Sequence, residues 1–448
     1  SSMHLLSAIL LGKLVAFLTK LFKLGGGSAA PGLYALSIEP DLVEKLASKI
    51  PTNVVITGTN GKTTTAKMLA HFAKTSGLRV IRNHTGSNLE RGIASTLISN
   101  YTLYPIPYTL DLGIWELDEA AFNSVALKLK PDVVVFLNIF RDQLDRYGEI
   151  NTVLKNWQET LKKIPSDTKV LVNGDDANTL KLATSFKGKV QKFGVKDFKI
   201  VGEGIVHKKE QDNLDFEAKN VKLNGLNGST FVLQTTSYKL PATLPLPGIY
   251  HIYDALAAFA IAHHLDLPIN QLADTLKTYS PAFGRVEKLP FVFIFLIKNP
   301  AGATQVFETI APNIKTGDRL LLALNDNLAD GTDVSWIWDA EFEKLLTLSL
   351  QGAKGAPRRG TGNLNFVRRQ ALLIFVSGTR AHDMAVRLKY AGIDSNKIIV
   401  QPDPQKALRE ARTDLKGRLF ILPTYTAMLE LQSILVKSGI KKHYWESD

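Results

Sequence analysis

The segment from Val54 to Leu69, VVITGTNGKTTTAKML, constrains the fold more than any other part of the chain. An apolar run is followed by a glycine-containing turn, a lysine, three threonines and an apolar helical pattern, which predicts the order strand, turn, helix. Such a turn lets backbone N–H groups and the positive end of the helix surround a phosphate. We therefore predict a phosphate-binding loop made of Gly58, Thr59, Asn60, Gly61, Lys62, Thr63 and Thr64.

Two residues of this loop have distinct predicted roles. Lys62 adds a full charge beside the outer phosphates, and the hydroxyl of Thr63 is placed to bind Mg²⁺. The spacing departs from the general GxxxxGK[ST] pattern, because Ile56 stands where the first glycine would be. A tight strand-to-helix turn without a ligand is the alternative, but the preceding strand, the following helix and the threonine run favour a nucleotide site.

A second strand end carries an acidic group. The apolar run Leu112-Gly113-Ile114-Trp115 leads directly into Glu116, with Asp118 and Glu119 behind it. Ligands of parallel α/β sheets bind outside the carboxyl ends of the strands, so Glu116 is predicted to hold Mg²⁺. A solvated acidic loop is the alternative interpretation.

Strand and helix patterns alternate from the phosphate loop to about residue 185, which predicts a doubly wound, mostly parallel sheet. Between about 190 and 240, short alternating runs with Asn-Gly turns predict a small antiparallel sheet. The alternating rhythm then returns in a second, Rossmann-like domain. We expect an N-terminal amphipathic helix and linker in residues 1–37, an ATP-binding domain in 38–288 and the second domain in 289–448.

Composition excludes several classes of site. The 448 residues are enough for two or three domains, and the chain has no cysteine, so it has no disulfide, thiolate nucleophile or cysteine zinc site. A net charge of +12 indicates an acidic partner surface, a phosphorylated substrate or an anionic membrane face. No motif supports nucleic acid as a partner. The ATP-site motif favours the cytoplasm.

The first apolar stretch, from Leu5 to Leu24, is interrupted by Lys13, Lys20 and Lys23. A signal peptide would carry its positive charge before the apolar part, and a membrane-spanning helix would bury Lys13 near its middle. Two interpretations remain, an interfacial helix on an anionic leaflet and a helix docked on the protein's own surface.

The segment NDNLADGTDVSWIWD, from Asn325 to Asp339, combines four aspartates with two tryptophans at a predicted strand end. A turn explains Asp330-Gly331 but not so many acids beside two large aromatics. The alternative is an N-capped helix start with Trp336 in the core.

Several motifs together resemble a known family. GTNGKTTT, Glu116 and LPGIYHIYDALAA (246–258) resemble the central ATP-binding domain of the Mur ligases. The motifs that narrow the resemblance to the MurT branch, the synthetase subunits of lipid II isoglutaminyl synthases, are NIFRDQLDRYGE (138–149), KNPAG (298–302), DGTDVSWIWD (330–339), SGTRAHDMAVRLKYAG (377–392) and PTYTAMLEL (423–431).

The resemblance implies an activity and partners. In this family ATP phosphorylates the α-carboxylate of D-glutamate in the lipid II stem peptide, and ammonia from a GatD-type glutaminase subunit converts the acyl phosphate to D-isoglutamine during peptidoglycan biosynthesis. It therefore implies ATP and Mg²⁺ as cofactors, a heterodimer, and a cytoplasmic protein in peripheral contact with the inner membrane face.

The resemblance also implies roles for individual residues. Lys62 would stabilise the β- and γ-phosphates, and Thr63 and Glu116 would bind Mg²⁺. Asn173, with Asp175 or Asp176, would lie near the adenine, and Arg285 would reach the nucleotide at the domain boundary. An aspartate of residues 330–339 would complete the partner's cysteine–histidine pair; Asp333 ranks first and Asp339 second.

Three features depart from the family pattern. His251 and Asp254 stand where the family usually has asparagines, Gln143 stands where many Mur ligases have a metal-binding histidine, and the four-cysteine zinc ribbon common in MurT proteins is missing or metal-free.

Two other functions compete. An amino-acid-adding Mur ligase or a folylpolyglutamate-type synthetase would not need residues 330–339, and an amino-acid-adding Mur ligase usually has about 100 residues before the phosphate loop, where about 50 precede it here. A non-catalytic scaffold for a glutaminase would not need Lys62, Thr63 and Glu116.

Overall fold

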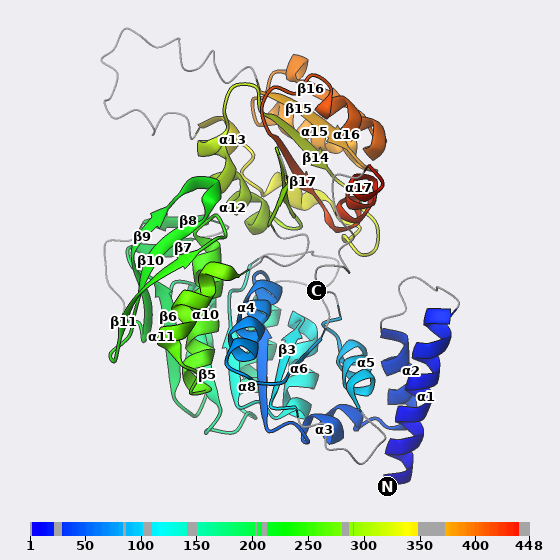
Figure 1. Ribbon diagram of the computed structural model, residues 1–448, viewed down its shortest axis with the longest axis vertical. Coiled ribbons are helices and arrows are strands. Elements are labelled where there is room, and N and C mark those ends of the chain that lie inside the picture. Colours follow the sequence, from blue (N-terminus) through cyan, green and yellow to red (C-terminus); the bar gives the residue numbers. More distant parts are fainter. Residues whose placement is uncertain are drawn as a thin grey trace.

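The computed structural model places a large α/β domain beside a smaller one (Figure 1). It describes residues 2–21, 29–83, 87–101, 110–140, 150–201, 204–207, 213–279, 286–289, 291–347 and 372–438. Arg285 and Gln143 lie outside these residues.

A nine-stranded sheet forms the larger domain, in the order β11-β10-β9-β6-β5-β4-β1-β3-β2. The strands from β2 to β9 in that order pair in parallel, which confirms the predicted doubly wound sheet. The nine strands are β1 (Thr52–Thr57), β2 (Val80–Arg82), β3 (Leu112–Leu117), β4 (Val133–Phe136), β5 (Lys169–Asn173), β6 (Val190–Val195), β9 (Phe216–Leu223), β10 (Ser229–Gln234) and β11 (Lys239–Leu244).

The central strands are buried on both faces, as their continuous apolar sequence requires. Val54 and Ile56 pack on the side of α4 (Lys62–Thr75) and α10 (Tyr250–His264), whereas Val55 packs on the opposite side. The remaining helices are α11 (Ile269–Thr275), which follows α10, and, on the Val55 side, α3 (Leu42–Ala47), α5 (Glu90–Asn100), α6 (Glu119–Leu129), α8 (Ile150–Leu161) and α9 (Ala177–Ala183).

The antiparallel strands predicted between 190 and 240 are present, but they extend the main sheet instead of forming a sheet of their own. β10 pairs antiparallel with β9 and with β11, and β9 itself joins the parallel part through β6. A separate two-stranded ribbon, β7 (Phe198–Val201) and β8 (Gly204–His207), lies outside this sheet.

The second domain has a six-stranded sheet in the order β12-β13-β17-β14-β15-β16. Only the β12–β13 pair is antiparallel, so this sheet has the predicted Rossmann-like character. Its elements are β12 (Val286–Leu289), β13 (Val292–Phe295), α12 (Pro300–Ile310), β14 (Arg319–Ala323), α13 (Lys344–Thr347), β15 (Leu373–Ser377), α15 (Ala381–Tyr390), β16 (Ile398–Val400), α16 (Pro404–Arg412), β17 (Leu419–Pro423) and α17 (Tyr425–Lys437).

The chain begins with two helices, α1 (Ser2–Leu21) and α2 (Ala30–Ile38), that pack on each other and on α5. Figure 1 shows them at the opposite edge of the larger domain from β11. Ala8 and Ile9 of α1 are buried in this contact, so the helix is docked on the protein's own surface along one side. Within the described part of the chain, no helix combines the length and apolar character needed to cross a membrane.

Candidate phosphate-binding and phosphoryl-transfer site

The loop between β1 and α4 has the backbone of an anion-binding turn. Gly58 has a φ of +145° and Gly61 a φ of +90°, values that other residues rarely adopt. A Cβ on Gly61 would lie 2.2 Å from Oδ1 of Asp254, and one on Gly58 would lie 2.9 Å from Cβ of Leu137. Backbone conformation and the close approach of neighbouring segments therefore both require glycine at these two positions.

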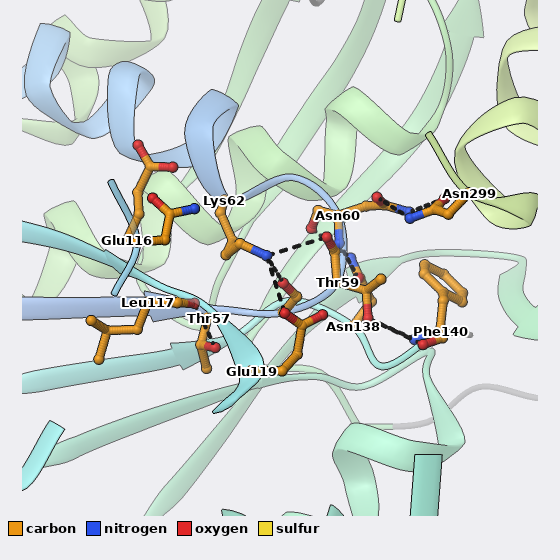
Figure 2. Close-up of polar contacts among 12 residues, drawn as sticks. Thr57, Thr59, Asn60, Lys62, Glu116, Leu117, Glu119, Asn138, Phe140 and Asn299 are labelled. Atoms are coloured by element: carbon orange, nitrogen blue, oxygen red, sulfur yellow. Dashed lines mark hydrogen bonds and ion pairs between the residues drawn. The ribbon is translucent and has the colours of Figure 1, made fainter. Parts of the chain in front are cut away.

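The residues after β4 hold this loop in place. The N–H of Asn60 donates to Oδ1 of Asn138 (2.8 Å), and Nδ2 of Asn138 donates to the carbonyl of Asn60 (3.0 Å). The N–H of Phe140 also donates to Oγ1 of Thr59 (3.0 Å; Figure 2). Sequence reasoning assigned no role to Asn138, although its place directly after a buried strand was the available signal.

Lys62 lies inside the loop and is buried. Its ammonium donates to the carbonyls of Gly58 and Thr59, and it lies 3.6 Å from Oε2 of Glu119 (Figure 2). Lys298, from the second domain, donates to the same Thr59 carbonyl (3.4 Å) that Lys62 reaches at 3.3 Å. Two ammonium groups from two domains therefore meet at one carbonyl of the loop.

The Thr63 hydroxyl donates to Oε2 of Glu116 at 2.7 Å, and both residues are buried. Asn83 fixes the backbone of Glu116 through hydrogen bonds of 2.8 and 2.9 Å to its N–H and carbonyl. A hydroxyl and a carboxylate are hard oxygen ligands of the kind that Mg²⁺ prefers. The structure thus brings together the two residues predicted as metal ligands.

Among the described residues there is no cluster of three or more His, Asp or Glu side chains arranged to hold a metal ion. A magnesium site built from one or two protein ligands plus phosphate oxygens does not need such a cluster. The Thr63–Glu116 pair therefore remains compatible with this metal.

The end of β5 supplies the predicted adenine-side residues Asn173, Asp175 and Asp176, all of them buried. Nδ2 of Asn173 donates to the carbonyl of Leu137 (3.0 Å), which joins this strand end to the segment that holds the phosphate loop. Asp176 caps α9 by accepting from the N–H of Asn178 (2.9 Å). Its hydrogen bonds give Asp176 a structural role in addition to the predicted one.

Burial raises the pKa of Asp176 from 3.8 to about 6, even though backbone N–H groups donate to its carboxylate. Tyr253 of α10 donates its hydroxyl to Asp175 (2.8 Å), and burial together with this carboxylate holds the pKa of Tyr253 well above its usual value. These buried polar groups tie the end of β5 to α10.

His251 and Asp254, two of the residues that depart from the family pattern, form a contact beside the loop. Nδ1 of His251 lies 3.2 Å from Oδ2 of Asp254, both side chains are buried, and the other oxygen of Asp254 faces Gly61. Nε2 of His251 has no hydrogen-bond partner among the described residues. A pocket beside the loop is lined by residues that include Asn60, Gly61, Asn138, Asn173, Phe193, Tyr250, Tyr253 and Asp254.

A larger cavity, of about 860 Å³, lies at the opposite edge of the sheet. Its lining includes the first residues of β1, β3, β4 and β5 and no residue of the phosphate loop. Ligands of such sheets bind at the carboxyl ends of the strands, so we place the reaction at the loop and not in the larger cavity.

The aspartates of residues 325–339 have different environments in the second domain. Asp330 is buried and accepts from the N–H (2.7 Å) and hydroxyl of Thr426, and Asp326 pairs with Arg380 (3.2 Å). Asp333 is half-buried, with Oδ1 accepting from the N–H of Ser335 (2.8 Å), and Asp339 is exposed. Asp330 and Asp326 therefore make contacts within the second domain.

Comparison with known proteins shows the family of this chain. The Mur ligase middle domain profile matches residues 56–262, and the MurT ligase C-terminal profile matches residues 296–356 and 363–428. The chain is 31% identical to the lipid II isoglutaminyl synthase (glutamine-hydrolyzing) subunit MurT of Streptococcus pneumoniae, over 94% of this chain and 95% of that protein. Its identity to the same subunit of Staphylococcus aureus is 29%, over 92% and 93% of the two chains.

Solved structures share the fold. MurF from Acinetobacter baumannii superposes with a TM-score of 0.64 at 16% identity, covering 91% of this chain and 80% of its own. MurF from Thermotoga maritima in complex with ADP gives a TM-score of 0.63 at 14% identity, covering 90% and 84%.

The fold and the phosphate loop together define an ATP-dependent ligase of the Mur type. Within that class the resemblance extends through the second domain, whose profile is specific to one branch. The chain belongs to the MurT family.

Proposed function

We propose that this chain is the synthetase subunit of a lipid II isoglutaminyl synthase. The observation that carries the proposal is the convergence of Lys62, Thr63 and Glu116 on one glycine loop, in a chain related along nearly its whole length to MurT subunits. The relatives' name describes them as glutamine-hydrolysing and as subunits, which supports an ammonia-supplying partner.

The reaction has two steps. An oxygen of the D-glutamate α-carboxylate attacks the γ-phosphorus of ATP, the bond to the bridging oxygen breaks, and ADP leaves with that electron pair. Ammonia then attacks the carbonyl carbon of the acyl phosphate, loses a proton and expels inorganic phosphate, which leaves D-isoglutamine.

Cationic side chains and backbone N–H groups of the chain would stabilise the negative charge on the transferring phosphoryl group. The transferring phosphoryl group carries negative charge on its equatorial oxygens, and preorganised cations beside it lower the barrier. Lys62 supplies one cation from within the loop and Lys298 a second from the other domain. Loop N–H groups bind the remaining phosphate oxygens.

Thr63 and Glu116 are the residues that would hold Mg²⁺, since their oxygens lie 2.7 Å apart at the start of α4. When bound, Mg²⁺ neutralises charge on the outer phosphates. Asn173, with Asp175 or Asp176, would line the adenine side, and Arg285 would reach the nucleotide from the domain boundary.

As expected from the sequence, the nucleotide would bind in residues 38–288, with Lys298 reaching it from the second domain, and a GatD-type glutaminase would dock on residues 289–448. Asp333 is the first candidate, and Asp339 the second, for the group that orients the partner's catalytic histidine. The half-buried position of Asp333, fixed by the hydrogen bond from Ser335, suits an orienting carboxylate better than the exposed position of Asp339.

The second substrate, lipid II, carries a pyrophosphate and is anchored in the membrane. A net charge of +12 suits both the pyrophosphate and the anionic inner leaflet. The protein would therefore work in the cytoplasm as a peripheral protein at the inner face of the membrane.

ATP hydrolysis by Lys62→Ala, compared with the parent in the presence of the glutaminase and the acceptor, tests whether this chain is catalytic. A synthetase loses turnover in the variant. Equal hydrolysis in both proteins would instead identify a scaffold that only docks the glutaminase.

A further inference from the structure

Helix α1 exposes many of its large apolar side chains. Large apolar side chains of α2 are exposed as well, and exposure over the whole set ranges from 38% for Ile38 to 73% for Met3. We call this set the outer apolar face; it comprises Met3, Leu6, Leu10, Leu14, Phe17, Leu18 and Leu21 of α1 and Leu33, Tyr34 and Ile38 of α2.

The spacing of the members on α1 makes their part of the face continuous. Successive members on α1 are mostly three or four residues apart, which places them in one stripe along the helix. A 20-residue helix is about 30 Å long, so the stripe is far longer than an isolated exposed leucine. Contiguous exposed apolar surface of this size marks an interaction site.

The opposite side of α1 is already occupied. Ala8 and Ile9 are buried, and a Cβ on Gly12 would lie 3.2 Å from the carbonyl of Pro31 in α2. Since this side is packed on protein, only the outer stripe of α1 is available to contact a membrane or another molecule. A helix with that constraint lies along a surface and does not cross it.

The positive charge of residues 1–38 indicates what kind of surface the outer apolar face would bind. Residues 1–38 contain Lys13, Lys20 and Lys23 and no aspartate or glutamate. Lys13 lies between the buried Gly12 and the exposed Leu14, which sets it at the edge of the stripe. The first acid along the chain, Glu39, is paired with Lys45 at 2.6 Å. An apolar stripe with a cationic edge matches the acyl boundary and anionic headgroups of a bilayer.

A second copy of the chain fits this face less well. It would bring the same lysines and no carboxylate from residues 1–38 to meet them. A bilayer of anionic phospholipid satisfies the apolar stripe and its lysine edge together.

We propose that the outer apolar face docks the protein on an anionic phospholipid bilayer, with α1 lying in the plane of the interface. This inference rests on the proposed function, because a membrane-anchored acceptor gives the contact its purpose. It adds the surface through which that contact is made.

Co-sedimentation of the whole chain with vesicles tests the inference, using phosphatidylglycerol mixed with phosphatidylcholine against phosphatidylcholine alone. The double variant Leu14→Glu/Phe17→Glu is expected to lower the vesicle partition coefficient at least about tenfold. The matched control is Leu223→Glu, at a leucine 53% exposed in β9, compared with 52% for Leu14. It should bind vesicles like the parent.

A second pair of measurements tests the charge. Lys13→Ala/Lys20→Ala is expected to lower binding to anionic vesicles about tenfold and to weaken its dependence on salt. Circular dichroism of each variant establishes that the fold is retained.

The proposal is overturned if the Leu14→Glu/Phe17→Glu protein binds vesicles like the parent, or if Leu223→Glu reduces binding equally. It is also overturned if light scattering shows a dimer that this double variant dissociates while the parent ignores vesicles. Amidation of an acceptor presented in detergent micelles does not require docking on a bilayer. If the parent protein does not amidate that acceptor, the result counts against the proposed function and not against the proposal that the outer apolar face binds a membrane.

Discussion

Asn60 of the phosphate loop and Asn299 of the second domain exchange two amide hydrogen bonds, of 3.2 and 3.0 Å (Figure 2). Asn299 is fully buried and also caps α12 by accepting from the N–H of Gly302 (2.8 Å). The residue that caps α12 thus also links the second domain to the loop.

Breaking this amide pair should slow the reaction by misplacing the second domain. We expect Asn299→Ala to lower the rate of ATP turnover about tenfold or more, since two partly buried hydrogen bonds contribute about 1 kcal/mol each. Asn299→Asp separates the two roles of the residue, because a carboxylate still caps α12 but cannot donate to Asn60. If Asn299→Asp matches the parent in steady-state kinetics, the amide pair is irrelevant to catalysis.

Lys298 should act through its charge. Lys298→Met removes an ammonium beside the Thr59 carbonyl, and we expect turnover to fall about tenfold to a hundredfold, as for loss of one group that stabilises a transition state. Lys298→Arg keeps the charge and should recover most of the rate. The idea fails if Met and Arg at this position give equal rates.

The raised pKa of Asp176 predicts a pH-dependent stability. Below about pH 4 the carboxyl is neutral in both folded and unfolded chains; as the pH rises to 6, only the unfolded chain ionises, so stability is lost. A pKa raised from 3.8 to about 6 corresponds to a loss of about 3 kcal/mol. Asp176→Asn keeps an acceptor for the α9 cap and cannot titrate.

The measurement is the difference in free energy of unfolding between the parent and Asp176→Asn from pH 4 to pH 7. Relative to Asp176→Asn, the parent should lose free energy of unfolding between pH 4 and pH 6, and the difference should stay constant above pH 6. A difference that does not vary with pH would show that Asp176 ionises normally in the fold.

The aspartate that serves the partner can be identified by rescue with ammonia. Asp333→Asn should lower glutamine hydrolysis by the glutaminase subunit at least about a hundredfold, because an amide cannot orient and stabilise a protonated histidine. Amidation from added ammonium chloride should persist. Asp326→Asn is the control, since Asp326 already pairs with Arg380. If Asp339→Asn, and not Asp333→Asn, gives this pattern, our ranking is wrong.

Local patterns sufficed to predict the strands, the turn and the helix that carry the candidate site. The glycine loop, its lysine and the strand that delivers Glu116 were predicted because each lies within one strand-turn-helix unit. The hydrogen bond between Thr63 and Glu116 follows from the pairing of β1 with β3, whose register sets Ile56 beside Glu116. The sequence predicted that both strands end at the same edge of the sheet, but the structure alone shows that they are neighbours.

Contacts between distant segments were not predictable in the same way. Asn60 and Asn299 are 239 positions apart, and no periodicity in either segment indicates the other. KNPAG was recognised as a motif, but Asn299 followed by Pro300 is equally typical of any helix start. The extension of the main sheet by β9, β10 and β11 was missed for a related reason, since alternation predicts strands but not the strand on which they pair.

The central claim is that the chain activates a carboxylate for attack by ammonia. We would combine the purified chain with a GatD-type glutaminase, ATP, Mg²⁺, glutamine and a lipid II analogue, and measure the stem peptide by mass spectrometry. The account predicts a loss of about one mass unit, carboxyl to amide, that disappears without ATP and in Lys62→Ala. ATP turnover with an unchanged acceptor mass would contradict it, and would point to another nucleophile or another acceptor.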